Sequence, residues 1–172
     1  MASIKCSFCN MGIHYHNEPN GTEFIMFPSN FWYSLEHLTS NVNESYRYLK
    51  SDAIELEFPN SYYKFWMCPN CKSIILFEKN TPYVAGIYTV NHKHEKSNSS
   101  NIDYIVFSDK TWDFITERKI KLTYLPKKFP GEYFIVKSKD FFYVYADKDL
   151  SKLIQTYSLD LDITHKAKSE SI

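Results

Sequence analysis

The sequence predicts an α+β fold built mainly from antiparallel strands, with two or three helices packed on the sheet. Three observations lead to this prediction. Aromatic residues make up 17% of the 172 residues, including 14 tyrosines and 13 phenylalanines, and such side chains favour half-buried strands. Short apolar runs alternate with turn residues along most of the chain. Two further segments repeat their apolar residues at helical spacing.

The first half of the chain contains one clear helix among several strands. Residues 23–27 are typical of a strand that Pro28 ends, and Ser29 is placed to cap the helix that follows. The apolar positions of this helix are Phe31, Trp32, Leu35 and Leu38. A short helical segment is expected at 46–49. The next strands are expected at 53–58, 62–67, 73–77 and 83–90.

The second half begins with the polar segment 91–101, which is rich in Ser and Asn and predicts a flexible loop. A strand at 102–107 is followed by Ser108, which can cap a helix with Asp109 in its first turn. The last elements are expected at 132–137, at 141–146 and in "KLIQTYSLDLDI". We expect one domain over residues 1–164 and a disordered tail over 165–172.

Two Cys-x-x-Cys pairs are the strongest functional signal. The first is Cys6 with Cys9, in "CSFCNMG", and the second is Cys68 with Cys71, in "CPNCKS". Each pair can place two thiolates on one side of a tight turn, and two such turns complete a tetrahedron around zinc. The turn residues Pro, Asn and Gly in these motifs suit such loops. The sequence therefore predicts one metal site formed by all four cysteines.

This pattern resembles the zinc-ribbon superfamily, in which two knuckles at the tips of hairpins share one structural zinc ion. The resemblance covers the two knuckles and their flanking strands. The segment between Cys9 and Cys68 is much longer than in ordinary ribbons, which indicates a large insertion. Four cysteine ligands leave no open position for a reacting water, so the resemblance implies a structural Zn²⁺ rather than a catalytic one.

Other ligand sets remain open at this level. Each cysteine pair could instead be a redox couple or a pair of buried thiols. A metal could also be held by the first pair together with its neighbours, through Cys6, Cys9, His14 and His16. His92 and His94 lie in the polar loop and are the remaining candidates for a second metal or an acid/base group.

A later segment of the chain is similar in sequence to the second knuckle and its flanking strands. "YYKFWMCPNCKSIILFEKN" aligns with "GEYFIVKSKDFFYVYADKD", so that Lys137 and Asp140 stand in the places of Cys68 and Cys71. Neither Lys137 nor Asp140 is counted as a ligand. Two hairpins that obey the same turn rules account for the similarity, with an internal duplication as the alternative.

The composition narrows the class of function. Twenty basic residues balance twenty acidic ones, so no global charge favours nucleic acid or an anionic membrane. No apolar run is long enough to span a membrane, and the first residues lack a secretion signal, so we expect a cytoplasmic protein. Phosphate loops, the nucleophile elbow and the His-Glu-x-x-His motif are absent, and we expect no enzymatic activity.

Recognition of another protein is the function that the sequence favours. The many aromatic residues and the acidic first 60 residues would suit an interaction protein, such as an immunity protein that neutralises a toxin. The alternative is a nucleic-acid-binding or regulatory protein that uses the basic run Arg118, Lys119, Lys121, Lys127 and Lys128. A metal-dependent enzyme is the second alternative.

Overall fold

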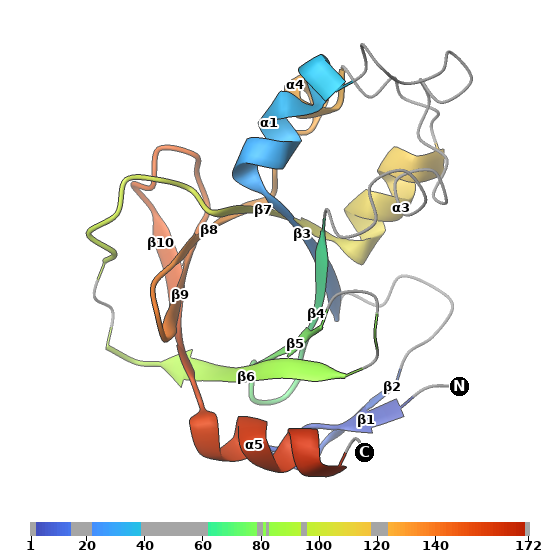
Figure 1. The fold of residues 1–172 in the computed structure, drawn as a ribbon, viewed down its shortest axis with the longest axis vertical. Coiled ribbons are helices and arrows are strands. Elements are labelled where there is room, and N and C mark those ends of the chain that lie inside the picture. The colour runs from blue at the N-terminus through green and yellow to red at the C-terminus, as the bar shows by residue number, and fades with distance from the viewer. Residues whose placement is uncertain are drawn as a thin grey trace.

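The computed structural model describes residues 3–14, 22–38, 62–78, 81, 83–93, 96–117 and 124–170. Eight strands in these ranges close into an antiparallel barrel, and two more form a small separate sheet. Figure 1 looks along the barrel, so that the strands form a ring with the helices outside it. No helix among the described residues combines the length and apolar character needed to cross a membrane.

The barrel consists of two consecutive groups of four strands. The first group is β3 (Glu23–Pro28), β4 (Tyr63–Met67), β5 (Ile74–Phe77) and β6 (Val84–Asn91). The second group is β7 (Tyr104–Ser108), β8 (Tyr133–Lys137), β9 (Phe141–Tyr145) and β10 (Leu153–Leu159). Each group pairs in chain order, and the pairs β3 with β7 and β6 with β10 join the groups into a closed ring.

The remaining elements cover the outside of the ring. The helices are α1 (Ser29–Leu38), α3 (Asp109–Glu117), α4 (Leu125–Lys128) and α5 (Leu161–Glu170). The small sheet is formed by β1 (Ser3–Lys5) and β2 (Gly12–His14). In Figure 1, α1 and α3 lie on one side of the barrel, and α5 lies against β6 on the opposite side.

The predicted α+β fold of zinc-ribbon type is wrong, because the sheet closes on itself and the helices among the described residues are few and short. Local sequence patterns identify strands, but they do not show which strands pair across the chain. The seam between β3 and β7 joins Ile25 to Phe107, and the seam between β6 and β10 joins Tyr88 to Leu159. These long-range pairings remove the free edges of the sheet.

Most predicted elements exist close to the expected bounds, with some differences in detail. Ser108 caps α3 as predicted, since its hydroxyl accepts a hydrogen bond from the backbone N–H of Thr111. The hydroxyl of Ser29, at the start of α1, donates to the carbonyl of Ile102. The expected elements at 46–49 and 53–58 lie outside the described residues. Helix α5 continues to Glu170, into the segment for which we expected a disordered tail.

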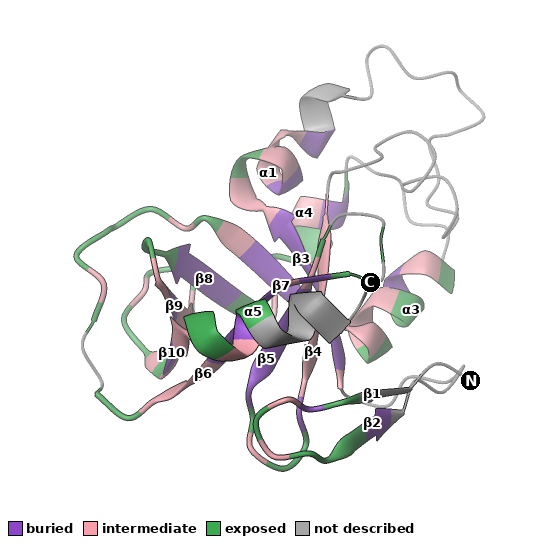
Figure 2. Ribbon diagram, turned by 60° about the horizontal axis from the view of Figure 1, so that its bottom comes forward, coloured by how far each residue is buried: buried purple, intermediate pink, exposed green. Residues whose placement is uncertain are grey.

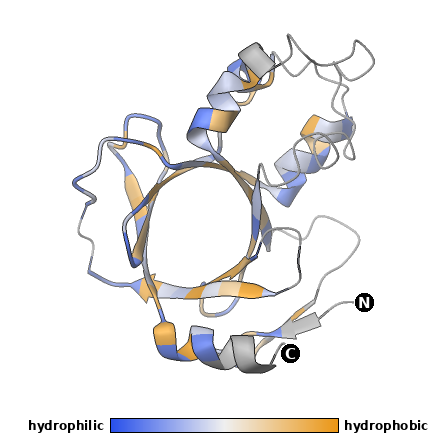
Figure 3. Cartoon of the chain, viewed as in Figure 1, coloured by the Kyte–Doolittle hydropathy of each residue, from blue (hydrophilic) through white to orange (hydrophobic). Residues whose placement is uncertain are grey.

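Side chains alternate between the interior and the outer faces of the barrel. Along β3, Met26 points into an interior cluster with Val106, whereas Ile25 and Phe27 belong to a cluster beneath the helices. Buried residues therefore follow one another along the strands, which carry long purple stretches in Figure 2 and orange stretches around the ring in Figure 3. A strand that is buried on both faces has a continuous run of apolar residues in its sequence, without the alternation of apolar and polar residues that marks a strand with one exposed face.

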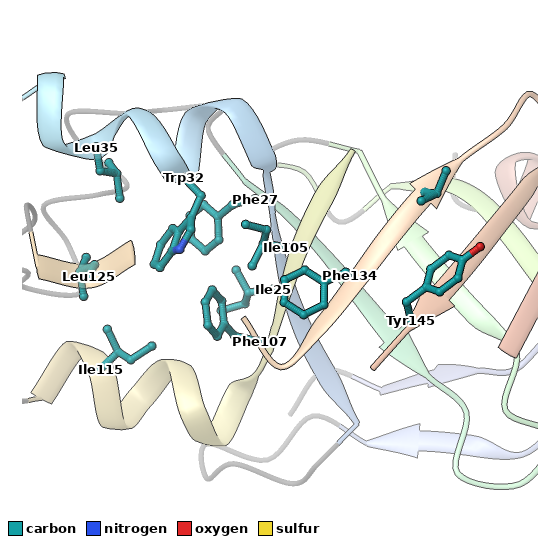
Figure 4. Close-up of a cluster of buried hydrophobic side chains, with 11 residues drawn as sticks. Ile25, Phe27, Trp32, Leu35, Ile105, Phe107, Ile115, Leu125, Phe134 and Tyr145 are labelled. Atoms are coloured by element: carbon teal, nitrogen blue, oxygen red, sulfur yellow. The ribbon is translucent and has the colours of Figure 1, made fainter. Parts of the chain in front are cut away.

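The cluster beneath α1, α3 and α4 is built around aromatic rings (Figure 4). Phe27 contacts Trp32 and Trp112, with ring centroids 4.9 and 5.0 Å apart. Phe107 contacts Trp32 at 5.0 Å and Trp112 at 6.4 Å. In both halves of the barrel a tryptophan follows the strand's phenylalanine by the same spacing, in "FPSNFW" and "FSDKTW". The same strand-to-helix turn is thus used twice.

The two groups of strands are related by an approximate two-fold axis. The β3–β7 seam is centred on the pair Met26 and Val106, and the β6–β10 seam is centred on Thr89 and Ser158. The registers within the two groups match as well, so the paired strand positions in one half have equivalents in the other. The hairpin that echoes the second knuckle is thus part of a repeat of four strands, which turn rules alone do not explain.

Candidate metal centre

The two Cys-x-x-Cys loops are the turns of two hairpins and have the same backbone geometry. In each, the N–H of the first cysteine donates to the carbonyl five residues later, at 2.8 Å from Cys6 and 2.9 Å from Cys68. The residue after the second cysteine donates back to the first, and it adopts a left-handed conformation, with φ of 58° at Asn10 and 61° at Lys72. The first loop links β1 to β2, and the second links β4 to β5.

The folded chain brings all four predicted cysteines together. Their sulfur atoms lie within 4.8 Å of one another, with Cys6 and Cys68 buried and Cys9 and Cys71 half-buried. The Sγ atoms of Cys6 and Cys71 are 3.6 Å apart, as are those of Cys9 and Cys68. A tetrahedron of thiolates at about 2.3 Å from a zinc ion has sulfur–sulfur edges of about 3.8 Å. This cluster could therefore hold one metal ion.

A serine hydroxyl completes the surroundings of the sulfurs. The Oγ atom of Ser73 lies 3.3 Å from Sγ of Cys6 and 3.1 Å from Sγ of Cys71. Ser73 is itself buried, and it follows directly on the left-handed residue Lys72. A hydroxyl in this place can donate to a thiolate and fix its orientation, as outer-shell groups of metal sites do.

The four thiols do not share one electrostatic environment. The backbone N–H of Met11, aided by the side chain of Asn70, lowers the pKa of Cys9 to about 6. Burial raises the pKa of Cys68 to about 12, and burial also raises the pKa of Cys71. A bound divalent cation would deprotonate these sulfurs despite their burial, because its charge dominates its surroundings.

Of the other candidate ligands, His92 is the one whose side chain the structure describes. Within the described residues, the group of side chains with metal-ligand spacing contains the four cysteines and does not include His92. The placement of His16 and His94, and of the His14 side chain, lies outside what the structure describes. Of the basic run, Lys127 and Lys128 are exposed at the end of α4, whereas residues 118–123 lie outside the described ranges.

The sequence identified the four sulfurs and missed the groups around them. Ser73 carries no motif signal, although its place directly after "CPNCK" could have marked it as a neighbour of the sulfurs. The packing beneath the site was not predicted either. Ile13 from β2 and Ile75 and Ile87 from the barrel form a small apolar cluster with Cys6 and Cys68. This cluster attaches the β1–β2 hairpin to the outer wall of the barrel.

Comparison with known proteins adds one match. The model of a family described as a domain of unknown function, DUF8617, matches residues 2–96, which is more than half of the chain. The match spans both knuckles and the strands up to β6, and the second group of barrel strands lies beyond it. No curated protein and no solved structure matches the chain.

Proposed function

The chain belongs to the DUF8617 family, whose domain has no known function, and we propose from its own geometry that it is a non-enzymatic binding protein with a structural zinc ion. The observation that carries this proposal is the complete set of four cysteines. Zinc accepts four thiolates in a tetrahedron, and such a site has no open position for a substrate or a reacting water.

The partner that we propose is another protein, bound at the first knuckle. Phe8 and Met11 lie in the same loop as Cys6 and Cys9, and their side chains are 55% and 41% exposed. Large apolar side chains held on a rigid loop lose little conformational entropy on binding, which makes them suitable anchors for an interface. An immunity protein that neutralises a toxin would have these properties.

The zinc ion is tested by measuring the metal content of the purified protein, alone and as the variants Cys6→Ser and Cys68→Ser. About one zinc per chain is expected in the native protein, and each variant should lose it because both loops supply ligands. Ser151→Cys, which adds a thiol at an exposed site, controls for nonspecific metal binding. Retention of the metal by Cys6→Ser would contradict a shared site.

The protein partner is tested with the product of the neighbouring gene. Co-expression should suppress any toxicity of that product, and Phe8→Ser together with Met11→Ser should weaken the complex by at least tenfold in a binding titration. Leu161→Ser is the matched control, since Leu161 is also exposed but belongs to α5. Equal loss of binding in the control would contradict an interface at the first knuckle.

Nucleic-acid binding is the second candidate, and one observation favours it. Tyr124 is 48% exposed and directly precedes α4, whose last turn carries the exposed Lys127 and Lys128. An aromatic ring beside two lysines can stack on a base while the lysines contact phosphate. Binding of a single-stranded oligonucleotide that falls steeply with salt, and that Tyr124→Ala weakens, would support this candidate over a protein interface.

A further inference from the structure

The barrel contains a cavity of about 690 Å³ at the end that carries the second knuckle. Cys71, Lys72 and Ser73 contribute to its lining, together with the end of β6 and the start of β10. Side chains from the barrel interior form its walls: Phe24, Phe65, Ile74, Val106, Ile135 and Val144. A closed barrel of eight strands is just wide enough to be filled by side chains or to hold one small ligand.

The choice of side chains on the strands contributes to the cavity. Four of its lining residues are smaller than the residues at the equivalent positions of the other half of the barrel. The pairs are Ile74 with Phe142, Val90 with Leu159, Val106 with Met26, and Val144 with Leu76. None of the four larger partners lines the cavity. The larger residues at these four positions would therefore reduce the space.

At the opposite end of the barrel interior, aromatic side chains occupy the equivalent space. Phe142 stacks on Tyr88 with ring centroids 4.2 Å apart, and Tyr63 meets Tyr104 edge-on at 5.7 Å. Protein interiors are normally packed this densely, and a large void forfeits the contacts that would stabilise it. A cavity at one end of a barrel with two-fold repeated strands thus indicates a binding site for a small-molecule ligand.

The lining also indicates the chemistry of the ligand. The walls are aliphatic and aromatic, and the buried Tyr157 lies among them. Lys72 is the one lysine among the lining residues, and no Arg, Asp or Glu of the described chain lines the cavity. An apolar body suits the walls, and an anionic group suits Lys72.

We propose that this cavity binds an apolar molecule with a single carboxylate, of the size of a long-chain fatty acid, with its hydrocarbon inside the barrel and its carboxylate near Lys72. The volume lies within the range of about 300 to 1,000 Å³ that is common for small-molecule sites. Phe8 of the first knuckle also lines this cavity, so the two proposed sites meet at that side chain, whereas Ile74 and Val144 belong to the interior cluster of the barrel.

The probe for this site is cis-parinaric acid, a fluorescent fatty acid, titrated into the zinc-loaded protein. The fluorescence should rise and saturate at one molecule per chain. The double variant Ile74→Phe with Val144→Leu copies the residues of the filled end and should weaken binding at least tenfold. Thermal unfolding shows whether the double variant folds. If it does not, Val90→Leu, which copies Leu159, is the milder variant to test. Leu161→Phe adds bulk on the surface and should bind as the native protein does.

The carboxylate is tested with the methyl ester of the same acid and with Lys72→Asn. Asn keeps the left-handed backbone, as Asn10 does in the first knuckle, and removes the charge. This variant should bind the acid on the order of tenfold more weakly and the ester as before, because a hydrogen bond to a charged group is lost. Its zinc content should be unchanged.

Two results would overturn the proposal. The first is an absence of saturable binding of cis-parinaric acid, and the second is native affinity in the folded double variant, which would place the probe on the surface. Equal affinity of the native protein for the acid and its ester would overturn the assignment of the carboxylate to Lys72.

Discussion

At the scale of single residues, the metal centre depends on two backbone conformations and one hydroxyl group as well as on the four cysteines. The left-handed backbone at Asn10 and Lys72 turns each loop so that its two sulfurs face the other loop. The hydroxyl of Ser73 then lies between Cys6 and Cys71 and belongs to the second loop. Ser73 therefore links the two loops even though it is not one of the proposed ligands.

Removing this hydroxyl should weaken metal binding without abolishing it. For Ser73→Ala we expect zinc affinity to fall by about tenfold to a hundredfold, because the sulfurs lose the group that orients them. Competition with a chromogenic chelator measures the change. Ser97→Ala alters a hydroxyl in the loop between β6 and β7 and should leave the affinity unchanged. Equal affinities for the native protein and Ser73→Ala would show that the hydroxyl has no part in the site.

At the scale of elements, helix α5 is fastened to the barrel by its first turn. The N–H of Asp160 donates to the carbonyl of Ile87 in β6, and the N–H of Ile87 donates to the hydroxyl of Thr164 at 2.9 Å. The carboxylate of Asp160 accepts from the N–H of Ile163 and so caps the helix. The start of α5 and strand β6 thus provide hydrogen-bond partners for each other's backbone groups.

Replacing Thr164 by Val should destabilise the protein. Val keeps the shape of the side chain but leaves the buried N–H of Ile87 without its acceptor, and we expect the free energy of unfolding to fall by about 1 to 3 kcal/mol. Urea denaturation of the zinc-loaded protein measures this. Thr116→Val is the matched control, because the hydroxyl of Thr116 forms its hydrogen bond to the carbonyl of Asp113 at the surface. A similar loss of stability in both variants would show that the hydrogen bond between Ile87 and Thr164 is not the cause.

At the scale of the whole molecule, the barrel interior makes stability depend on alkaline pH. Burial raises the pKa of Tyr157 from 10.0 to about 12, so the folded state favours the neutral phenol. This stabilisation is complete below pH 10, the unfolded value, and it is lost as pH rises towards 12. Tyr88 and Tyr104, whose pKa values are also raised chiefly by burial, act in the same direction.

Tyr157→Phe should therefore reduce the loss of stability at high pH. We expect the native protein to lose about 2 to 3 kcal/mol more than this variant between pH 9 and pH 12, because the pKa of the Tyr157 phenol is about 12 in the folded state against 10.0 in the unfolded state. Urea denaturation at a series of pH values measures both curves. Tyr83→Phe removes an exposed hydroxyl and should follow the native curve. Parallel curves for the native protein and Tyr157→Phe would contradict the assignment to Tyr157.

Loss of the metal should release the first hairpin and leave the barrel closed. The small sheet of β1 and β2 is separate from the barrel, whereas β4 and β5 are paired on both sides within the ring. On treatment with a strong chelator we expect faster hydrogen exchange in residues 3–14 and 68–73 and continued protection in β7 to β10. Exchange measured by mass spectrometry tests this, with magnesium-loaded chelator as the control. Uniform loss of protection would show that the whole fold depends on the metal.

The sequence by itself determined the four sulfur positions and most of the strands and helices, because turns, caps and apolar spacing act over short distances. It did not determine the barrel or the cavity. The seams at Ile25 with Phe107 and at Tyr88 with Leu159 join residues that are distant in the chain, and no local pattern specifies such pairs. The cavity appears only when Ile74 and Phe142 are seen to occupy equivalent positions, and that equivalence is a property of the paired strands. Tertiary structure therefore decided where the space lies.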